Sequence, residues 1–306
     1  MSSLLEIDRL SVEFRMAEGA IRAVNDVSVD VGRGEVVALV GESGSGKSVT
    51  ALAILRLIPE PPGRITAGNV RFDGHDLLQL DEEGIRRIRG RRIGMVFQEP
   101  MTSLNPVLSI GRQITEAMQT HLGLTSAAAH ERAIELLDMV GIAEPERRLK
   151  QYPHHLSGGM RQRAMIAMAL SCKPELIIAD EPTTALDVTI QAQILHLMQG
   201  LCRRLDVALM IITHNLGVVA RYADRVNVMY AGRVVEQGPA AEIYRNPGHP
   251  YTIGLLNSVP RLDRPRGVAI DPIPGSPPDP LSLPSGCSFR PRCRLAVPHC
   301  ATAVPP

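Results

Sequence analysis

An eight-residue segment that begins at Gly41 has the residue types and spacing of a phosphate-binding loop. It reads Gly-Glu-Ser-Gly-Ser-Gly-Lys-Ser and directly follows the apolar run at 36–40. A buried strand that opens through glycines into a helix turns backbone N–H groups, and the positive end of the helix, toward an anion. In this pattern Lys47 reaches the β- and γ-phosphates of a nucleotide, and the Ser48 hydroxyl is a ligand of Mg²⁺. The segment predicts a site for a nucleoside triphosphate, to which we assign Gly41, Ser43, Gly44, Gly46, Lys47, Ser48 and Val49.

A second apolar run ends in a pair of acids that can act on such a nucleotide. Residues 176–179 read Leu-Ile-Ile-Ala and are followed by Asp180 and Glu181. A buried parallel strand delivers these side chains to its carboxyl end, where open α/β sheets bind their ligands. We expect Asp180 to hold Mg²⁺ through water and Glu181 to polarise the attacking water as a general base. Acids at a strand end can also be solvated turn residues, so the pair needs support from other motifs.

A second candidate anion site lies in the middle of the chain. Ser157, Gly158 and Gly159 stand before a helical pattern at 161–172. A serine followed by glycines at a helix start presents free N–H groups to an anion. A phosphate-loop enzyme with one self-contained site does not need two such cradles.

With this second cradle the sequence resembles the ATP-binding-cassette superfamily. In that family the signature motif of one subunit, here 157–159, closes over the γ-phosphate held by the phosphate loop of another subunit. Further matches to the family's motifs follow its order: the adenine-stacking aromatic Phe14, the Q-loop residue Gln98, the D-loop Ala185-Leu186-Asp187 and the switch histidine His214. The resemblance implies that Gln98 and His214 join Glu181 in catalysis and that Gln98 is also a Mg²⁺ ligand. It assigns the remaining nucleotide contacts to Phe14, Ser157, Gly158, Gly159 and Asp187.

Each of these matches has a simpler interpretation when it is taken alone. Phe14 is then an ordinary aromatic of a strand. Gln98 and Asp187 are capping or turn residues, and His214 is a hydrogen-bonded histidine at a strand end. The common order of the motifs favours the cassette. Two positions depart from the commonest form of the motifs without being phosphate ligands in this scheme, Met160 and Asn215.

Hydrophobic periodicity places the motifs on an α/β fold. Strands are predicted at 10–14, 24–31, 36–40, 70–73, 93–97, 176–179, 208–213, 226–230 and 233–236, and helices at 110–122 and 127–140. The pattern predicts a P-loop NTPase core with a mostly parallel sheet and an antiparallel edge, an inserted helical subdomain and a short C-terminal extension that contains cysteines. We expect the nucleotide-binding core at 1–98 and 171–245, the helical subdomain with the signature motif at 99–170, and the extension at 246–306.

The composition is that of a globular protein with little net charge. The 306 residues carry 33 basic and 32 acidic side chains, which argues against a nucleic-acid partner and against electrostatic binding to lipid. We interpret the basic run at 86–92 as a solvated face. No run of 18 apolar residues occurs, and residues 1–8 lack the core of a signal peptide. We expect a cytoplasmic protein that reaches the membrane through its partners.

Two segments resemble the dipeptide, oligopeptide and nickel importer subfamily of the cassettes. They are 99–106, which follows the Q-loop, and 245–252, which precedes a Pro-rich stretch. The resemblance implies an ATP-hydrolysing subunit, peripheral at the cytoplasmic face of the cell (inner) membrane, that powers the import of peptides. Import of nickel or another solute stays open, as does a soluble cassette ATPase outside transport.

The same resemblance implies the partners of the chain. The sequence contains no internal repeat, so the second cassette, a copy or a paralogue, is expected from another chain. The other implied partners are two transmembrane permease subunits and an extracytoplasmic solute-binding protein.

Three cysteines lie close together in the C-terminal extension. In the resembling peptide-importer subunits this segment carries an iron–sulfur cluster, which implies a 4Fe-4S cluster on Cys287, Cys293 and Cys300. Such a cluster takes four thiolates, and His299, a cysteine missing from this chain, or three free thiols stay open as alternatives. The remaining cysteines are interpreted as small buried apolar side chains, Cys172 and Cys202.

A Pro-rich stretch at 271–284 leads to these cysteines. Pro-rich segments act as semi-rigid spacers with little core of their own. We therefore expect the spacer to hold the cysteines apart from Lys47 and Asp180, so that changes in the extension leave ATP binding intact.

Overall fold

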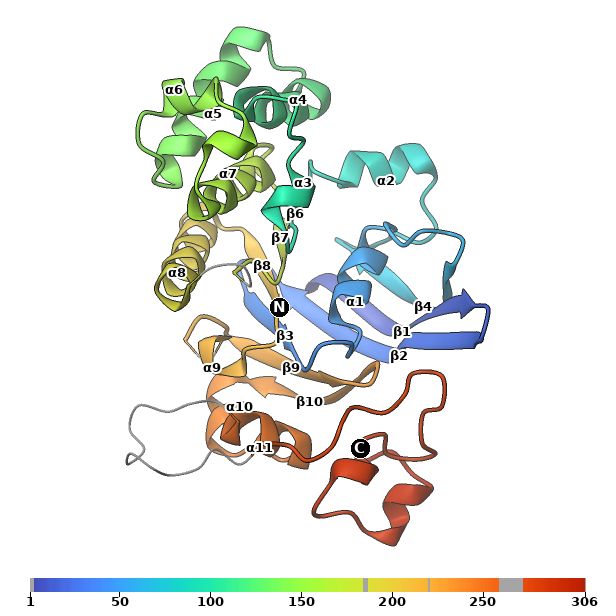
Figure 1. Cartoon of the computed structure of the whole chain (residues 1–306). Helices are drawn as coiled ribbons and strands as arrows, with labels where there is room; N and C mark the ends of the chain where they lie inside the picture. Colours follow the sequence, from blue (N-terminus) through green and yellow to red (C-terminus); the bar gives the residue numbers. More distant parts are fainter. Residues whose placement is uncertain (1–2, 184–186, 220, 259–271, 306) are drawn as a thin grey trace.

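The strands of the protein form two sheets (Figure 1). The structure, a computed structural model, describes residues 3–183, 187–219, 221–258 and 272–305. The antiparallel sheet has the strand order β2 (Gly19–Gly32), β1 (Ser3–Met16), β4 (Gly63–Phe72) and β5 (His75–Asp76). The second sheet has the order β10 (Arg233–Pro239), β9 (Arg225–Tyr230), β3 (Val36–Val40), β8 (Ala208–Thr213), β7 (Leu176–Asp180) and β6 (Ile93–Val96).

The second sheet confirms the predicted α/β fold. Strands β9, β3, β8, β7 and β6 are parallel, and β10 pairs antiparallel with β9 at one edge. Every residue of β3 and β7 is buried, which explains why both read as continuous apolar runs. The strands predicted at 10–14, 24–31 and 70–73 differ in one respect, because they lie in β1, β2 and β4 of a separate sheet rather than at the edge of this one.

Helix α1 (Lys47–Ile54) lies between the two sheets and is held by both. One hydrophobic cluster joins side chains of this helix to side chains of each sheet, among them Ala51, Ile54, Leu10, Val27, Val37, Leu39 and Met210. Burial on both sides fixes the helix start, and with it the phosphate loop that precedes it. Helix α2 (Glu82–Ile88) contributes Ile85 and Ile88 to the same cluster.

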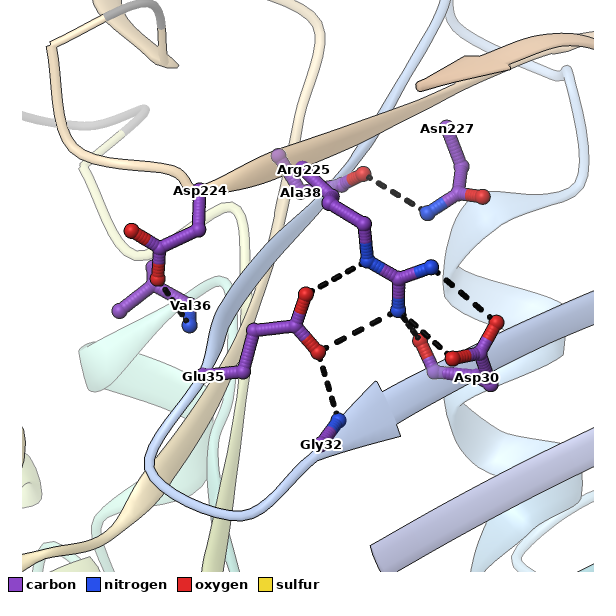
Figure 2. Close-up of polar contacts among 8 residues, drawn as sticks. All are labelled: Asp30, Gly32, Glu35, Val36, Ala38, Asp224, Arg225 and Asn227. Atoms are coloured by element: carbon purple, nitrogen blue, oxygen red, sulfur yellow. Dashed lines mark hydrogen bonds and ion pairs between the residues drawn. The ribbon is translucent and has the colours of Figure 1, made fainter. Parts of the chain in front are cut away.

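Arg225, at the start of β9, ties the two sheets together (Figure 2). Its Nε and Nη2 donate to the Glu35 carboxylate at 2.5 and 3.3 Å, and Nη1 and Nη2 donate to the carboxylate of Asp30 on β2 at 3.2 and 2.8 Å. The same Glu35 carboxylate accepts a 2.6 Å hydrogen bond from the N–H of Gly32. These bonds fasten the chain that passes from the antiparallel sheet into β3.

Two helices, α7 (Gly158–Leu170) and α8 (Val188–Leu205), pack on the opposite face of the parallel sheet. Four more helices pack on α7 or on one another, farther from the sheet (Figure 1): α3 (Pro100–Ser103), α4 (Ile110–Leu122), α5 (Ser126–Met139) and α6 (Pro145–Leu149). The helix predicted at 110–122 is confirmed residue for residue, and the next begins and ends one residue before its predicted bounds of 127–140. Since α7 and α8 share one hydrophobic cluster, the division of the chain at 170 stays a prediction.

The C-terminal part packs on the same sheet through a third hydrophobic cluster. This part begins with α10 (Ala240–Arg245) and α11 (Pro250–Asn257). Residues 272–305, drawn in red in Figure 1, follow in the chain and lie beside α11. Val40, Val228, Tyr251 and Phe289 lie in this cluster, together with the short helix α9 (Leu216–Val219). Among the helices that the structure describes, none is long and apolar enough to span a membrane.

The basic run at 86–92 is a solvated face only in part. Arg86 and Arg87 are exposed, as predicted. The half-buried Arg89 donates to the carbonyl of Leu55 just after α1 at 2.8 Å. Arg92 donates to the Glu175 carboxylate at 2.6 Å. Two of the arginines thus anchor α1 and β7 rather than face solvent.

Candidate nucleotide site

The phosphate loop connects β3 to α1 and passes close to other backbone. Gly46 has a φ of +100°, and a Cβ built there lies 2.3 Å from the carbonyl oxygen of Ala23. A Cβ at Gly41 lies 2.1 Å from the carbonyl oxygen of Met229. Only glycine fits at these two positions, which explains the glycines of the predicted motif.

Lys47 is buried at the centre of this loop. Its Nζ donates to the carbonyl oxygens of Gly41 and Glu42 at 3.0 and 2.9 Å and lies 3.4 Å from the Ser45 hydroxyl. Burial lowers the pKa of the Lys47 ammonium, and three nearby carboxylates oppose this shift. A cation therefore sits inside the ring of loop backbone.

Ser48 and Asp180 bring two oxygen atoms together beside Lys47. The Ser48 hydroxyl donates to Oδ1 of Asp180 at 2.9 Å. Asp180 ends β7 and is 6% exposed. Burial raises the pKa of its carboxyl group, while the Ser48 hydrogen bond and the Lys47 charge act in the opposite direction.

Glu181 stands between Gln98 and His214, the two residues that the family resemblance assigns to catalysis with it. The Gln98 amide donates to Oε2 of Glu181 at 3.1 Å, and Nδ1 of His214 lies 3.3 Å from Oε1. The three residues follow β6, β7 and β8, which are neighbouring parallel strands and end at the same edge of the sheet. Glu181 has a φ of +45°, a conformation uncommon for a residue with a side chain.

One cavity of about 710 Å³ joins the loop to these catalytic candidates. It is lined by Ala23, Glu42, Ser43, Gly44, Gly46, Lys47, Ser48, Val49, Gln98, Glu181 and His214. Sequence reasoning missed two of these residues. Glu42 lies within the loop motif, at a position where the motif allows any residue. Ala23 lies on β2 and reaches the cavity only through the tertiary fold, so no local sequence pattern could have identified it.

Phe14 does not line this cavity. It lies on β1, where its backbone pairs with Ile21 and Gly63, and its half-buried ring packs against the cluster between the sheets. The simpler interpretation, an aromatic of a strand, describes these contacts. Stacking of Phe14 on adenine stays a prediction.

The signature residues and Asp187 lie at helix starts outside the cavity. The exposed Ser157 caps α7 by accepting a hydrogen bond from the N–H of Met160 at 3.4 Å, and Gly158 and Gly159 form the first turn. Asp187 caps α8 by accepting from the N–H of Ile190 at 3.0 Å. Their nucleotide contacts stay predictions, and the other D-loop residues, Ala185 and Leu186, lie outside the described part of the chain.

The expected iron–sulfur site is not supported. Cys287 is buried and Cys293 and Cys300 are half-buried against the third hydrophobic cluster. Over the described residues, no group of three or more His, Cys, Asp and Glu side chains, His299 included, is arranged to hold a metal ion. Three thiolates also fall short of the four that a 4Fe-4S cluster takes. The other cysteines are buried as predicted, and burial raises the pKa of the Cys202 thiol to about 12.

The extension is not held apart from the phosphate loop, and this part of the prediction is wrong. Pro277, Pro278 and Pro280 line a small cavity together with loop residues 42–45. Arg292 makes an ion pair with Glu42 at 2.7 Å. The Pro-rich stretch therefore lies beside the loop, and Arg292 contacts the loop directly.

Two family profiles match the chain. The family described as ABC transporter matches residues 24–184, which include the phosphate loop and the two acids at the end of β7. The chain belongs to the ABC transporter family. This ABC cassette is accordingly an ATPase subunit. A second family, described as the C-terminal region of oligopeptide/dipeptide transporters, matches residues 235–300.

Named relatives align with nearly the whole ABC cassette. One relative is a protein of Brucella melitensis biotype 1 that is provisionally named a peptide import ATP-binding protein. It is 58% identical to this chain, over 99% of this chain and 93% of its own length. The oligopeptide transport ATP-binding protein OppD of Bacillus subtilis is 52% identical over 97% of this chain and 83% of its own. The dipeptide transport ATP-binding protein DppD of the same organism is 50% identical over 100% of this chain and 91% of its own.

Solved structures share the cassette fold. A dimeric ATP-binding cassette in a post-hydrolysis state, bound to ADP and Pi, matches with a TM-score of 0.69 at 29% identity, over 77% of this chain and 98% of its own. A member of an ABC transporter complex from Clostridium perfringens matches with a TM-score of 0.68 at 28% identity, over 80% of this chain and 92% of its own. The fold predicted from the motifs is thereby confirmed.

Proposed function

We propose that this ABC cassette couples the hydrolysis of ATP to the import of peptides across the cytoplasmic membrane. The observation that carries the proposal is the match of residues 235–300 to the C-terminal region of oligopeptide/dipeptide transporters, because this region lies outside the matched nucleotide-binding core. The names of relatives at 50% to 58% identity, which refer to peptide, oligopeptide and dipeptide transport, support the same substrate class.

In this proposal the phosphate loop binds the triphosphate of ATP. Lys47 supplies a buried cation, and the loop backbone and the first turn of α1 supply N–H donors. The carbonyl oxygens that Lys47 now contacts hold its ammonium in place until phosphate oxygens replace them. The side of the cavity that borders Ala23 is where we place the base and ribose.

The donors beside the loop fit a Mg²⁺ ion. The hydroxyl of Ser48 and the carboxylate of Asp180 already lie within 2.9 Å of each other, and Mg²⁺ prefers such hard oxygen ligands. The amide nitrogen of Gln98 faces Glu181, so we assign the amide oxygen to the ion. When bound, Mg²⁺ offsets negative charge on the β- and γ-phosphates.

Glu181 is the residue that we assign as the general base. It accepts a proton from water as the water oxygen bonds to the γ-phosphorus and the bond from that phosphorus to the bridging oxygen breaks. Gln98 and His214 hold one carboxylate oxygen each, so the carboxylate is oriented before substrate arrives. The Glu181 side chain is 12% exposed, so the protein covers most of its surface and limits its motion.

The signature motif is assigned to a second cassette. Ser157 and Gly158 are exposed and do not line the cavity that contains Lys47 of the same chain. We infer that they complete the site of a partner cassette, a copy or a paralogue. Two permease subunits, and through them an extracytoplasmic solute-binding protein, complete the transporter and hold this cassette at the cytoplasmic face of the membrane.

A mixing experiment tests the shared site. Lys47→Ala removes the phosphate-binding cation, and Ser157→Arg blocks the signature motif, so each variant alone is expected to lose ATP hydrolysis. If the partner is a copy, a mixture of the two variants forms some dimers with one intact site and regains part of the activity. If the partner is a paralogue, the two variants never share a dimer, so mixing them restores no activity. Full activity of Ser157→Arg, measured on a chain shown to stay monomeric, contradicts the shared-site proposal.

A transport experiment tests the substrate class. The chain is purified from membranes with its bound subunits, which are identified by mass spectrometry, and the complex is placed in lipid vesicles with ATP. Peptide uptake that depends on the solute-binding protein is the expected result, with Lys47→Ala as the inactive control. Uptake of Ni²⁺ without uptake of peptides identifies a metal importer, and recovery of ribosomes in place of permeases identifies a cassette outside transport. Either result overturns the proposal.

A further inference from the structure

Arg292, in the C-terminal extension, forms a two-pronged ion pair with Glu42 of the phosphate loop. Its Nη1 and Nη2 lie 2.7 and 3.0 Å from the two carboxylate oxygens. The residues are 250 positions apart in the sequence, and Arg292 is only 7% exposed. A guanidinium that binds both oxygens of a carboxylate fixes the orientation of that carboxylate as well as its distance.

The extension and Tyr230 at the end of β9 hold the guanidinium in addition to Glu42. Nε of Arg292 donates to the carbonyl of Pro274 at 2.9 Å, and Nη1 also donates to the Tyr230 hydroxyl at 3.3 Å. The guanidinium carbon lies 5.8 Å from the centre of the Tyr230 ring and 6.0 Å from that of Phe289. The Arg292 guanidinium is therefore held in place, ready to bind a carboxylate of the loop.

A second contact holds the backbone of the same loop residue. The N–H of Glu42 donates to the hydroxyl of Tyr251 on α11 at 2.8 Å, and Tyr251 is fully buried. The carbonyl oxygen of Glu42 accepts the 2.9 Å hydrogen bond from Lys47. The side chain and N–H of Glu42 are thus held by the C-terminal part of the chain, while its carbonyl holds the lysine that we assign to the phosphates.

Glu42 also presents an electrostatic problem that Arg292 solves. Its atoms line the cavity, where a carboxylate without a partner repels a triphosphate. The ion pair neutralises this charge and holds it against the extension. Loss of Arg292 therefore acts on nucleotide affinity in two ways, through a loosened loop and through an uncompensated negative charge.

We propose that the C-terminal extension is a positioning element of the ATP site, in which Arg292 and Tyr251 set the affinity for nucleotide through Glu42. The proposal requires that this chain binds ATP and does not depend on which solute is transported. Because coupling of this kind is reciprocal, bound nucleotide must also stabilise the extension on the loop.

Equilibrium binding of ATP to the full chain tests the proposal, with Glu181→Gln as the background so that no nucleotide is turned over. We expect Arg292→Ala to raise the Kd for ATP about tenfold or more, because it leaves a charged partner unpaired. Arg292→Lys keeps the positive charge but cannot bind both carboxylate oxygens with a planar guanidinium. Its Kd for ATP is therefore expected to lie between that of the chain with Arg292 and that of Arg292→Ala. Arg290→Ala is the matched control, since Arg290 lies in the same short turn and makes no ion pair among the described residues. An unchanged Kd for folded Arg292→Ala, or an equal loss in Arg290→Ala, overturns the proposal.

A double variant separates positioning from general damage to the fold. Glu42→Gln in the Arg292→Ala background removes the uncompensated charge, so ATP affinity is expected to recover in part, whereas a misfolded extension gives no recovery. Tyr251→Phe removes one hydroxyl and is expected to raise the Kd by a smaller factor. In the assembled complex the Arg292→Ala effect is expected in KM, with kcat at saturating ATP kept within about twofold. A double variant as weak as Arg292→Ala contradicts the proposal.

Hydrogen exchange tests the reciprocal coupling. ATP is expected to slow amide exchange over 285–300 in the Glu181→Gln chain, although these residues lie in the extension and outside the predicted nucleotide contacts. The same measurement on Arg292→Ala is expected to show no slowing at saturating ATP. If ATP leaves the rate of amide exchange over 285–300 unchanged in both chains, the proposal is contradicted. This result is independent of whether the transporter imports peptides.

Discussion

The hydroxyl of Ser48 donates a 2.9 Å hydrogen bond to Oδ1 of Asp180, across 132 residues of sequence. The bond joins the first turn of α1 to the end of β7, which is separated from β3 by a single strand, β8. Two hard oxygen atoms are therefore held side by side by buried elements before any ligand arrives. The arrangement predicts a Mg²⁺ site that is formed by the fold rather than by the nucleotide.

Ser48→Ala is expected to weaken binding of ATP with Mg²⁺ while it changes binding of ATP without the metal much less. Loss of a group that only supports a metal ligand typically lowers metal affinity or activity about 10–100-fold, so loss of the Ser48 ligand itself is expected to cost at least as much. The measurement is the Kd for ATP in the presence of Mg²⁺ and in the presence of a chelator, for both chains. An equal loss in the two conditions contradicts a role in Mg²⁺ binding and points to damage of the loop.

Glu181→Gln is expected to keep ATP binding and to lower kcat about 10²–10⁴-fold, because the amide keeps the size of the carboxylate and loses its basicity. Gln98 and His214, which now hold the two carboxylate oxygens, are unchanged in this variant. The assay is ATP hydrolysis by the assembled complex, with Kd measured in parallel. Turnover at the unmutated rate refutes the assignment of Glu181 as the base.

The predictable parts of this fold are those that are encoded over short distances. The run 208–213 is buried on both faces, so it reads as continuous apolar sequence and β8 has the predicted bounds. Strand β1 extends to Ser3–Met16, beyond the predicted 10–14, because only one face is covered and exposed residues such as Glu6 and Arg9 interrupt the apolar pattern. Period-2 alternation signals such a strand, and it is weaker than an unbroken run.

The candidate site divides in the same way. Gln98, Glu181 and His214 meet because each follows a parallel strand, and the order of motifs along the sequence was enough to single out all three as candidates. The contact of Arg292 with Glu42 was not predictable, because the partners are 250 positions apart. A Pro-rich composition indicates stiffness, but it does not show which surface the segment packs against.

Acid is expected to destabilise the C-terminal part through His249. Its Nδ1 accepts the N–H of Tyr251 at 3.1 Å and caps α11, so the neutral ring is the form that fits. Burial lowers the pKa of His249 in the folded protein, and the Glu236 charge opposes the shift. As the pH falls through about 6.5, the unfolded chain takes up a proton that the folded chain does not, so stability decreases.

The check is the melting temperature between pH 8 and pH 5, both chosen to bracket the usual histidine pKa of about 6.5. His249→Gln retains a hydrogen-bond acceptor and does not titrate, so its melting temperature is expected to fall less over this range than that of the unmutated protein. If the melting temperatures of the two chains fall equally between pH 8 and pH 5, the assignment of the effect to His249 is wrong.

Removal of Arg225 is expected to loosen the junction of the two sheets. Arg225 donates to Glu35 and Asp30, and Glu35 in turn accepts from Gly32 (Figure 2), so truncation leaves two carboxylates without their shared partner. Hydrogen bonds to charged groups contribute about 1.5–3 kcal/mol each, and partial exposure of these groups reduces that, so Arg225→Ala is expected to lower the free energy of unfolding by about 1–3 kcal/mol.

The control is Arg203→Ala, which removes a single exposed ion pair with Asp224 at 3.7 Å. An exposed pair contributes about 0–1 kcal/mol, because water and salt screen it and two flexible side chains lose entropy. Urea denaturation of the two variants is the measurement, and high salt is expected to shrink the small Arg203 effect more than the Arg225 effect. If the two variants lose the same free energy of unfolding, Arg225 contributes no more to stability than an exposed ion pair does, and its proposed role at the junction of the sheets is wrong.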